Sequence, residues 1–273
     1  MLGYCLRQVR EKAPLVHNIT NYVTVNDVAN VILASGASPI MADDEMEVEE
    51  ITSICQALNI NIGTLNHRTI QSMILAGKKA NELNHPVVLD PVGVGASRLR
   101  TSTALNLIKE VRFTVIRGNI SEIKTLALGS GVTQGVDANL VDTVTKDNLE
   151  ASIEFAKEFA KKYQCIVAIT GAIDLVSDGT KCYVIYNGKP QMSRITGTGC
   201  QLSGLLAGFL AANKENFLEA TVAAVCMMGV AGEIAWKNMR DSDGNSTYRN
   251  RIIDAIYKMT EEELESGANY EVR

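Results

Sequence analysis

The chain has 273 residues, of which 46% are hydrophobic and 21% are charged, and its formal net charge is −5. This composition is typical of a globular protein and excludes disordered, collagen-like and disulfide-scaffold classes. The acidic balance and the lack of Lys/Arg-rich runs argue against a nucleic-acid partner. The start of the chain shows no signal-peptide pattern, and the apolar runs are too short or too broken to span a membrane. We therefore expect a soluble protein.

The six cysteines are scattered and form neither a C-x-x-C pair nor a close Cys/His cluster. This spacing disfavours both a zinc site and a disulfide framework, and it fits a reducing cytoplasm best. The chain has no linker, low-complexity tract or internal repeat, so we expect a single domain over residues 1–273.

Apolar runs that end in Gly, Asp or Asn alternate with helix-like stretches along most of the chain. This alternation predicts an α/β fold with a mostly parallel central sheet and helices on both of its faces. We expect strands at residues 86–90, 114–117 and 165–170, and helices at residues 102–111 and 147–162.

The stretch 175–186 breaks the alternation, because two β-rich runs flank the turn sequence Ser177-Asp-Gly-Thr180. This pattern predicts a hairpin and therefore an antiparallel edge. Residues 199–212 and 218–236 are apolar nearly all round, as expected of helices buried in a core or a subunit interface. The polar tail over 238–273 is expected to fray at its end.

The strongest chemical signal places Gly197 and Gly199 immediately before a predicted helix, in Ile195-Thr-Gly-Thr-Gly-Cys-Gln-Leu-Ser-Gly204. Free N–H groups at a helix N-terminus form an anion site that suits a phosphoryl group and stabilises its developing charge. Cys200 lies in the first turn, where the helix dipole can lower its thiol pKa, and it could then act as a base toward an alcohol. A plain capping turn is an equally supported alternative for the glycines, and for a lone cysteine an inert buried side chain is favoured.

Two further segments place carboxylates just after predicted strands. Asp90, in Asp90-Pro-Val-Gly-Val-Gly95, lies at the edge where open α/β sheets bind ligands, and it could hold Mg²⁺ through water. Glu122, in Asn119-Ile-Ser-Glu122, follows a strand that ends near Arg117 and could hold the waters of a phosphate-bound Mg²⁺. An Asp-Pro turn and a helix-capping box are the alternatives.

Three other features have weaker chemical interpretations. His17 could line a pocket, but a hydrogen-bonded structural histidine is favoured. The acidic run over residues 43–50 could bind a cation, but a solvated helix start is favoured. Thr170 and Gly171, at a strand end, could contact nucleotide phosphates or simply close a turn.

Two familiar nucleotide motifs are absent from the sequence. Gly93-Val-Gly95 lacks the third glycine of the dinucleotide fingerprint, because Arg98 stands there, and no G-x-x-x-x-G-K-[ST] occurs. Any ATP site is therefore neither of the Rossmann nor of the Walker type.

The order and spacing of several motifs together resemble the ribokinase-like superfamily. Most of its kinases carry Gly-x-Gly-Asp with the aspartate as base, and the cysteine in that place here is similar to the hydroxyethylthiazole kinase family of thiamin salvage. The resemblance covers roughly residues 10–260. The motifs that carry it are Val16-His-Asn-Ile-Thr-Asn21, Ser38-Pro-Ile-Met-Ala42, Asp90-Pro-Val-Gly-Val-Gly95, Asn119-x-x-Glu122, Thr170-Gly171 and Gly197-Thr-Gly-Cys200.

This resemblance implies a ribokinase-like fold and transfer of the ATP γ-phosphoryl group to the primary hydroxyl of 4-methyl-5-(2-hydroxyethyl)thiazole, with Mg²⁺. It also implies a cytoplasmic homotrimer with substrate sites near the subunit boundaries. The implied site residues are Met41, Gly197 and Cys200 for the thiazole, Arg117, Asn119 and Thr170 for ATP, Asp90 and Glu122 for the metal and its waters, and Gly197, Gly199 and Cys200 for catalysis.

Three rival functions stay open on the sequence alone. One is a hydroxymethylpyrimidine or pyridoxal kinase with the same fold. Another is an ATP- or ADP-dependent dehydratase that repairs hydrated NAD(P)H, whose members usually keep Asp where Cys200 stands. The third is a protein that binds a thiazole or a nucleotide without turnover.

Overall fold

The computed structural model describes residues 1–129 and 143–273. Within them, nine strands form one sheet. Six strands pair in parallel, as expected for short apolar runs buried on both faces: β1 (Leu15–Ile19), β2 (Ser38–Met41), β3 (Ala57–Asn61), β4 (Val87–Asp90), β5 (Val115–Gly118) and β6 (Ile166–Ile169).

Three antiparallel strands complete the sheet beyond β6: β7 (Asp174–Ser177), β8 (Cys182–Ile185) and β9 (Tyr270–Val272). The predicted hairpin and antiparallel edge are thus confirmed as β7 and β8. The expectation that the C-terminal tail frays is wrong, because β9 pairs with β8 through the register Tyr183↔Val272. A third strand there satisfies backbone groups that an open sheet edge would leave exposed.

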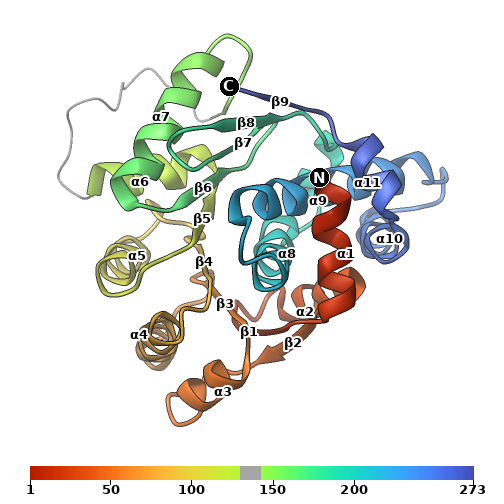
Figure 1. Cartoon of the computed structure of the whole chain (residues 1–273). Helices are drawn as coiled ribbons and strands as arrows, with labels where there is room; N and C mark the ends of the chain where they lie inside the picture. Colours follow the sequence, from red (N-terminus) through yellow and green to blue (C-terminus); the bar gives the residue numbers. More distant parts are fainter. Residues whose placement is uncertain (130–142) are drawn as a thin grey trace.

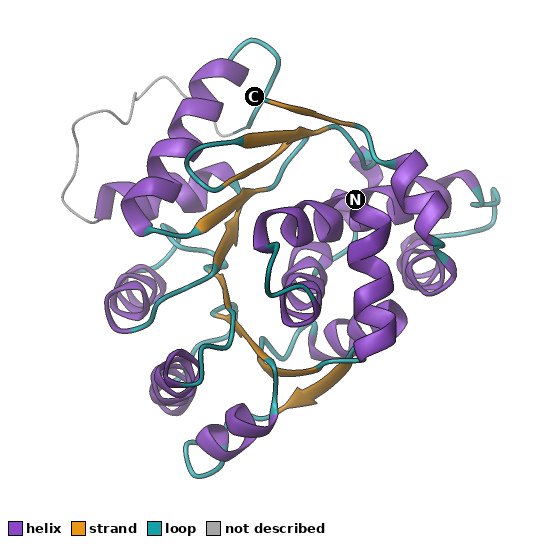
Figure 2. Ribbon diagram, viewed as in Figure 1, coloured by secondary structure: helices purple, strands orange, loops and turns teal. Residues whose placement is uncertain are grey.

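Helices cover both faces of the sheet, as predicted (Figure 1). One face carries α3 (Val48–Ile54), α4 (His67–Glu82), α5 (Arg98–Glu110), α6 (Ile120–Gly129) and α7 (Leu149–Tyr163). The other face carries α1 (Leu2–Lys12), α2 (Val25–Ser35), α8 (Thr198–Ala212), α9 (Phe217–Lys237), α10 (Asn245–Lys258) and α11 (Glu261–Gly267). Figure 2 shows the same layers coloured by type of secondary structure. A short 3₁₀ helix, Pro190–Arg194, precedes α8.

The helices α8 and α9 form the centre of the second layer, and both are apolar nearly all round, as predicted. Glycine lets α8 approach α2 closely, because a Cβ at Gly204 would lie 2.9 Å from the Val28 side chain. Among the described residues, α9 alone is long and apolar enough to cross a bilayer, but 78% of its apolar window is buried inside the protein. It is the core helix of this layer.

The strand order β2-β1-β3-β4-β5-β6-β7-β8-β9 reverses direction at β1. The chain leaves β1 for β2 on one side and returns to pair β3 on the other, with Val16 opposite Ala57. Open α/β sheets bind ligands at the carboxyl ends of the strands beside such a switch point. Because α8 packs against β1, β3 and β4, its N-terminus lies at this crevice.

We predict that Phe209→Ala lowers the free energy of unfolding by about 3–5 kcal/mol, because Phe209 is a fully buried side chain of α8 and its loss leaves a cavity. Urea denaturation measures the effect. The matched control, Glu158→Ala on the exposed face of α7, should stay within about 0.5 kcal/mol of the parent. Equal effects of the two substitutions would contradict this description of the core.

Candidate active site

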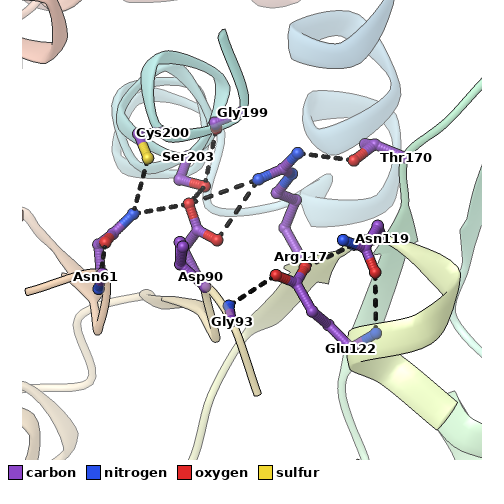
Figure 3. Close-up of polar contacts among 12 residues, drawn as sticks. Asn61, Asp90, Gly93, Arg117, Asn119, Glu122, Thr170, Gly199, Cys200 and Ser203 are labelled. Carbon is purple, nitrogen blue, oxygen red and sulfur yellow. Dashed lines mark hydrogen bonds and ion pairs between the residues drawn. The ribbon is translucent and has the colours of Figure 1, made fainter. Parts of the chain in front are cut away.

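Five polar side chains lie at the carboxyl ends of neighbouring parallel strands. Asn21 follows β1, Asn61 ends β3, Asp90 ends β4, Arg117 lies in β5 and Thr170 follows β6. The carboxyl ends of parallel strands meet at one edge of the sheet, so these residues form a polar row beneath the N-terminus of α8. Figure 3 shows four of them, Asn61, Asp90, Arg117 and Thr170.

Both glycines before Cys200 are required by steric contacts. Gly197 is the N-cap of α8 with φ +84°, and a Cβ there would lie 2.2 Å from the Thr24 side chain. A Cβ on Gly199 would lie 2.5 Å from the guanidinium of Arg117. The N-cap Gly197 has no side chain to cap α8, so the first N–H groups of the helix can bind an anion beside the arginine.

Asp90 is fully buried and is held from three sides (Figure 3). Its Oδ2 accepts hydrogen bonds from Asn61 Nδ2 and from Ser203 Oγ, both at 2.8 Å, and Arg117 Nη1 lies 3.4 Å from its Oδ1. Burial raises the pKa of Asp90, while the charge of Arg117 and the hydrogen bonds oppose that rise. Asp90 thereby fixes both the arginine and the first turns of α8.

Arg117 connects this carboxyl group to a cavity of about 470 Å³. Its Nη2 donates to Thr170 Oγ1 at 2.7 Å, and its Nε has no hydrogen-bond partner within the described residues. Asn119 and Gly199 line the same end of the cavity. A cation and a free helix N-terminus at one end of a cavity form a phosphate site.

The lining of the cavity also includes the apolar side chains of Met192, Val225 and Met228. A cavity that combines apolar side chains with a few polar groups suits a nucleotide, whose base is apolar on its faces and whose phosphates are charged. Asp174 also lines this cavity. Burial raises its pKa to about 7, although the backbone N–H of Gly171 and the charge of Arg117 oppose the rise.

Glu122 serves as a helix cap and also ties two loops together. Its Oε2 accepts the N–H of Asn119 and its Oε1 accepts the N–H of Gly93, both at 2.8 Å, while Asn119 Oδ1 accepts the N–H of Glu122 at 2.8 Å. The capping interpretation of Asn119-x-x-Glu122 is therefore confirmed. The same carboxylate anchors the glycine loop that follows Asp90 to α6.

The residues at this edge of the sheet fit a Mg²⁺ ion that is bound mainly by water and phosphate, and not one enclosed by protein side chains. The described residues contain no group of three His, Cys, Asp or Glu side chains that could enclose a metal ion. Asp90 and Glu122 lie close enough for the charge of Glu122 to raise the pKa of Asp90, yet their oxygens already accept hydrogen bonds. Mg²⁺ usually keeps several waters and binds through phosphates, and this donor set suits that mode.

Cys200 is 8% exposed and lies between two asparagines. Asn21 Nδ2 donates to its Sγ at 3.1 Å and Asn61 Nδ2 donates at 3.2 Å. Burial and the charge of Asp90 raise the pKa of Cys200, and hydrogen bonds with Thr24, Asn61 and Asn21 oppose that rise. The expectation that the helix dipole lowers this pKa is therefore wrong, because burial beside a carboxyl group dominates.

Several candidate residues do not line the cavity: His17, Met41, Asp90, Glu122, Gly197 and Cys200. Met41 ends β2 and packs, half-buried, against the core cluster that contains Cys200. His17 is structural, as favoured, since its ring nitrogens bond Thr52 Oγ1 and the Ala42 carbonyl, both at 2.9 Å. Burial lowers the pKa of His17.

Three site residues were not identified from the sequence: Asn21, Asn61 and Ser203. A signal for one of them was present, because Asn59 and Asn61 alternate with apolar residues in a fully buried strand. Buried polar side chains in a core strand require hydrogen-bond partners. That pattern marks β3 as a strand with a polar end, although it does not identify Cys200 as the partner.

The sheet order is that of the ribokinase-like fold expected from the sequence. A crystal structure of Bacillus subtilis pyridoxal kinase with ADP shares the fold, with a TM-score of 0.60 and 19% identity over 81% of this chain and 91% of that one.

The chain belongs to the hydroxyethylthiazole kinase family, whose model matches residues 6–262. A hydroxyethylthiazole kinase from Clostridium acetobutylicum is 60% identical over 99% of both chains. The structure of a hydroxyethylthiazole kinase protein from Pyrococcus horikoshii matches with a TM-score of 0.89 and 36% identity, over 100% of this chain and 98% of that one. The family expected from the sequence motifs is thus confirmed.

We predict that Gly199→Ala weakens ATP binding at least about tenfold, or roughly 1.4 kcal/mol, because the added methyl group displaces the guanidinium of Arg117. Calorimetric titration with ATP measures this effect. Gly171→Ala is the matched control in the same cavity, since its Cβ would meet only the Ile173 carbonyl oxygen at 3.8 Å. Equal affinity of both variants would contradict the steric argument.

Proposed function

We propose that this protein transfers the γ-phosphoryl group of ATP to the primary hydroxyl of 4-methyl-5-(2-hydroxyethyl)thiazole, a step of thiamin salvage. The observation that carries the proposal is the position of the Cys200 sulfur, which lies at the N-terminus of α8 next to the anion site of Arg117 and Gly199. The family match supports the thiazole alcohol as acceptor.

On the nucleotide side, Arg117, Asn119 and Thr170 would bind ATP. The arginine and threonine are already joined by a hydrogen bond, and all three residues line the cavity. The N–H groups from Gly197 to Cys200 would bind the oxygens of the transferred group. Such donors act where charge develops during the transfer.

On the metal side, Asp90 and Glu122 would hold the waters of Mg²⁺. The bound ion would neutralise charge on the β- and γ-phosphates. Arg117 Nη1 lies 3.4 Å from Asp90 Oδ1. We therefore expect the arginine to keep this carboxyl group oriented while the other nitrogen atoms of its guanidinium contact phosphate.

On the acceptor side, Gly197, Cys200 and Met41 would contact the thiazole alcohol. The raised pKa keeps Cys200 mostly a thiol at neutral pH, so its first role would be to orient the hydroxyl. A loose transition state needs little base strength, since positioning and charge stabilisation dominate phosphoryl transfer. A weakly acidic thiol is therefore compatible with this reaction.

We also propose that the chain works as one cytoplasmic domain and assembles as a homotrimer. One continuous sheet supports the single domain. Exposed apolar side chains close to the site support a subunit interface: Tyr22 is 77% exposed, Val23 60% and Met46 88%. Sedimentation equilibrium tests the trimer, which requires a mass about three times 29.6 kDa.

We predict Mg²⁺-dependent ADP formation with the hydroxyethylthiazole and at least about tenfold lower kcat/KM with the hydroxymethylpyrimidine and pyridoxal alcohols, because the family match favours the thiazole alcohol as acceptor. Coupled ADP release with each alcohol measures this preference, and removal of Mg²⁺ with a chelator should abolish turnover.

The rival functions give different results in that assay. Preference for the pyrimidine or pyridoxal alcohol would reassign the kinase. Recovery of NADH from its hydrate would indicate the repair dehydratase. Thiazole binding in a calorimeter without any ADP release would indicate a binding protein.

We predict that kcat rises with pH from about 7 to about 9, because a thiol with a raised pKa loses its proton only at high pH. Cys200→Ala should lower kcat by about tenfold to a hundredfold. Cys200→Asp should keep activity and move the rise to lower pH, since a carboxyl group loses its proton at lower pH than a thiol in the same surroundings. Wild-type turnover in the Ala variant would exclude the proposed role.

A further inference from the structure

Asn61, at the end of β3, is the one side chain within residues 1–129 and 143–273 that donates hydrogen bonds to both Asp90 and Cys200. Its side-chain nitrogen lies 2.8 Å from Asp90 Oδ2 and 3.2 Å from Cys200 Sγ (Figure 3). Its oxygen accepts the Gly63 N–H at 2.9 Å and an amide hydrogen of Asn21 at 3.0 Å. Asn61 is 1% exposed, so no bulk water competes for these bonds.

The partners fix which way the amide group points. The backbone N–H of Gly63 can only donate, so it must face the oxygen of Asn61. The Asp90 carboxylate accepts, so it faces the nitrogen. One amide nitrogen carries two hydrogens, and the second hydrogen is therefore directed at the sulfur of Cys200.

The sulfur of Cys200 therefore accepts a hydrogen bond from Asn61 at the end of β3. Asn21 donates to it as well, and Asn21 is itself oriented by the oxygen of Asn61. The remaining directions around the sulfur, including that of its own hydrogen, are left for groups outside this pair of amides. Loss of Asn61 removes one donor directly and removes the anchor of the other.

We propose that Asn61 is a positioning residue, which holds the sulfur of Cys200 toward the acceptor hydroxyl by donating one amide hydrogen to Cys200 and one to Asp90. The catalytic meaning of this role rests on the proposed kinase function. The geometry itself does not, because the four hydrogen bonds join residues of this chain alone.

Asn61→Asp is the sharpest test, since aspartate has the same shape but cannot donate to both acceptors. In this variant a proton shared between the new carboxyl group and Asp90 replaces the hydrogen bond from Asn61 to Asp90. No hydrogen is left to donate to the sulfur of Cys200, so that hydrogen bond is lost. We expect Cys200 to react at least about tenfold more slowly with iodoacetamide at neutral pH, because the thiolate loses a hydrogen bond. Mass spectrometry of the peptide that contains Cys200 measures the rate.

The matched control is Asn59→Ala. Asn59 is buried on the same strand and donates to Asn18, and no hydrogen bond links it to Cys200 or Asp90. We expect the alkylation rate of Cys200 in this variant to stay within about twofold of the parent. An unchanged rate in Asn61→Asp, or an equal slowing in Asn59→Ala, would overturn the proposal.

A double-mutant cycle separates positioning from general support of the fold. Asn61→Ala should lower kcat about tenfold in the parent and by less than about twofold in a Cys200→Ala background, because its effect passes through the sulfur. An equal loss in both backgrounds would mean that Asn61 acts through Asp90 or through the fold and not through the sulfur, and it would overturn the proposal. If Asn61→Ala does not fold, the isosteric Asn61→Asp takes its place in the cycle.

The ADP assay tests the proposed kinase function, and the alkylation experiment tests the role of Asn61, so the two proposals can fail independently. If the protein releases no ADP with any thiazole alcohol, the kinase assignment falls. The alkylation experiment still decides on Asn61, because it needs only the folded protein and Cys200.

Discussion

The buried carboxyl group of Asp90 organises this site. It has no contact with solvent, so its charge or its proton must be matched by groups from the protein. Those groups come from three elements: Asn61 from β3, Arg117 from β5 and Ser203 from α8. Packing α8 onto the sheet is therefore also the step that assembles the anion site, because the same contact brings the helix N-terminus to the arginine.

Close steric contacts set the shape of the site as firmly as the charges do. Gly199 leaves room for the guanidinium of Arg117, and Gly197 adopts a left-handed conformation against Thr24. Glu122 anchors the loop at Gly93 through the same carboxylate that caps its own helix. A site built from backbone N–H groups requires such constraints, since its donors cannot adjust by rotating a side chain.

Much of the fold and part of the site could be predicted from residue patterns. The apolar strands that end in Asp90 and Arg117, the hairpin at Asp178-Gly179 and the two apolar helices each have a local cause in the sequence. The tail could not be predicted, because β9 is stable only where β8 offers it an open edge. The pKa of Cys200 could not be predicted either, because it depends first on burial in the folded core and then on the charge of a carboxyl group that lies 110 positions away in the chain.

The sequence by itself determined the α/β alternation, the glycine turn before Cys200 and the capping pair Asn119 and Glu122, since each depends on neighbours within a few residues. The motifs also identified the family. Only the tertiary structure decided which strand ends meet and that two asparagines hold the sulfur, because these contacts join residues separated by 139 to 179 positions. Burial at that junction then reversed the pKa shift that the helix alone would produce.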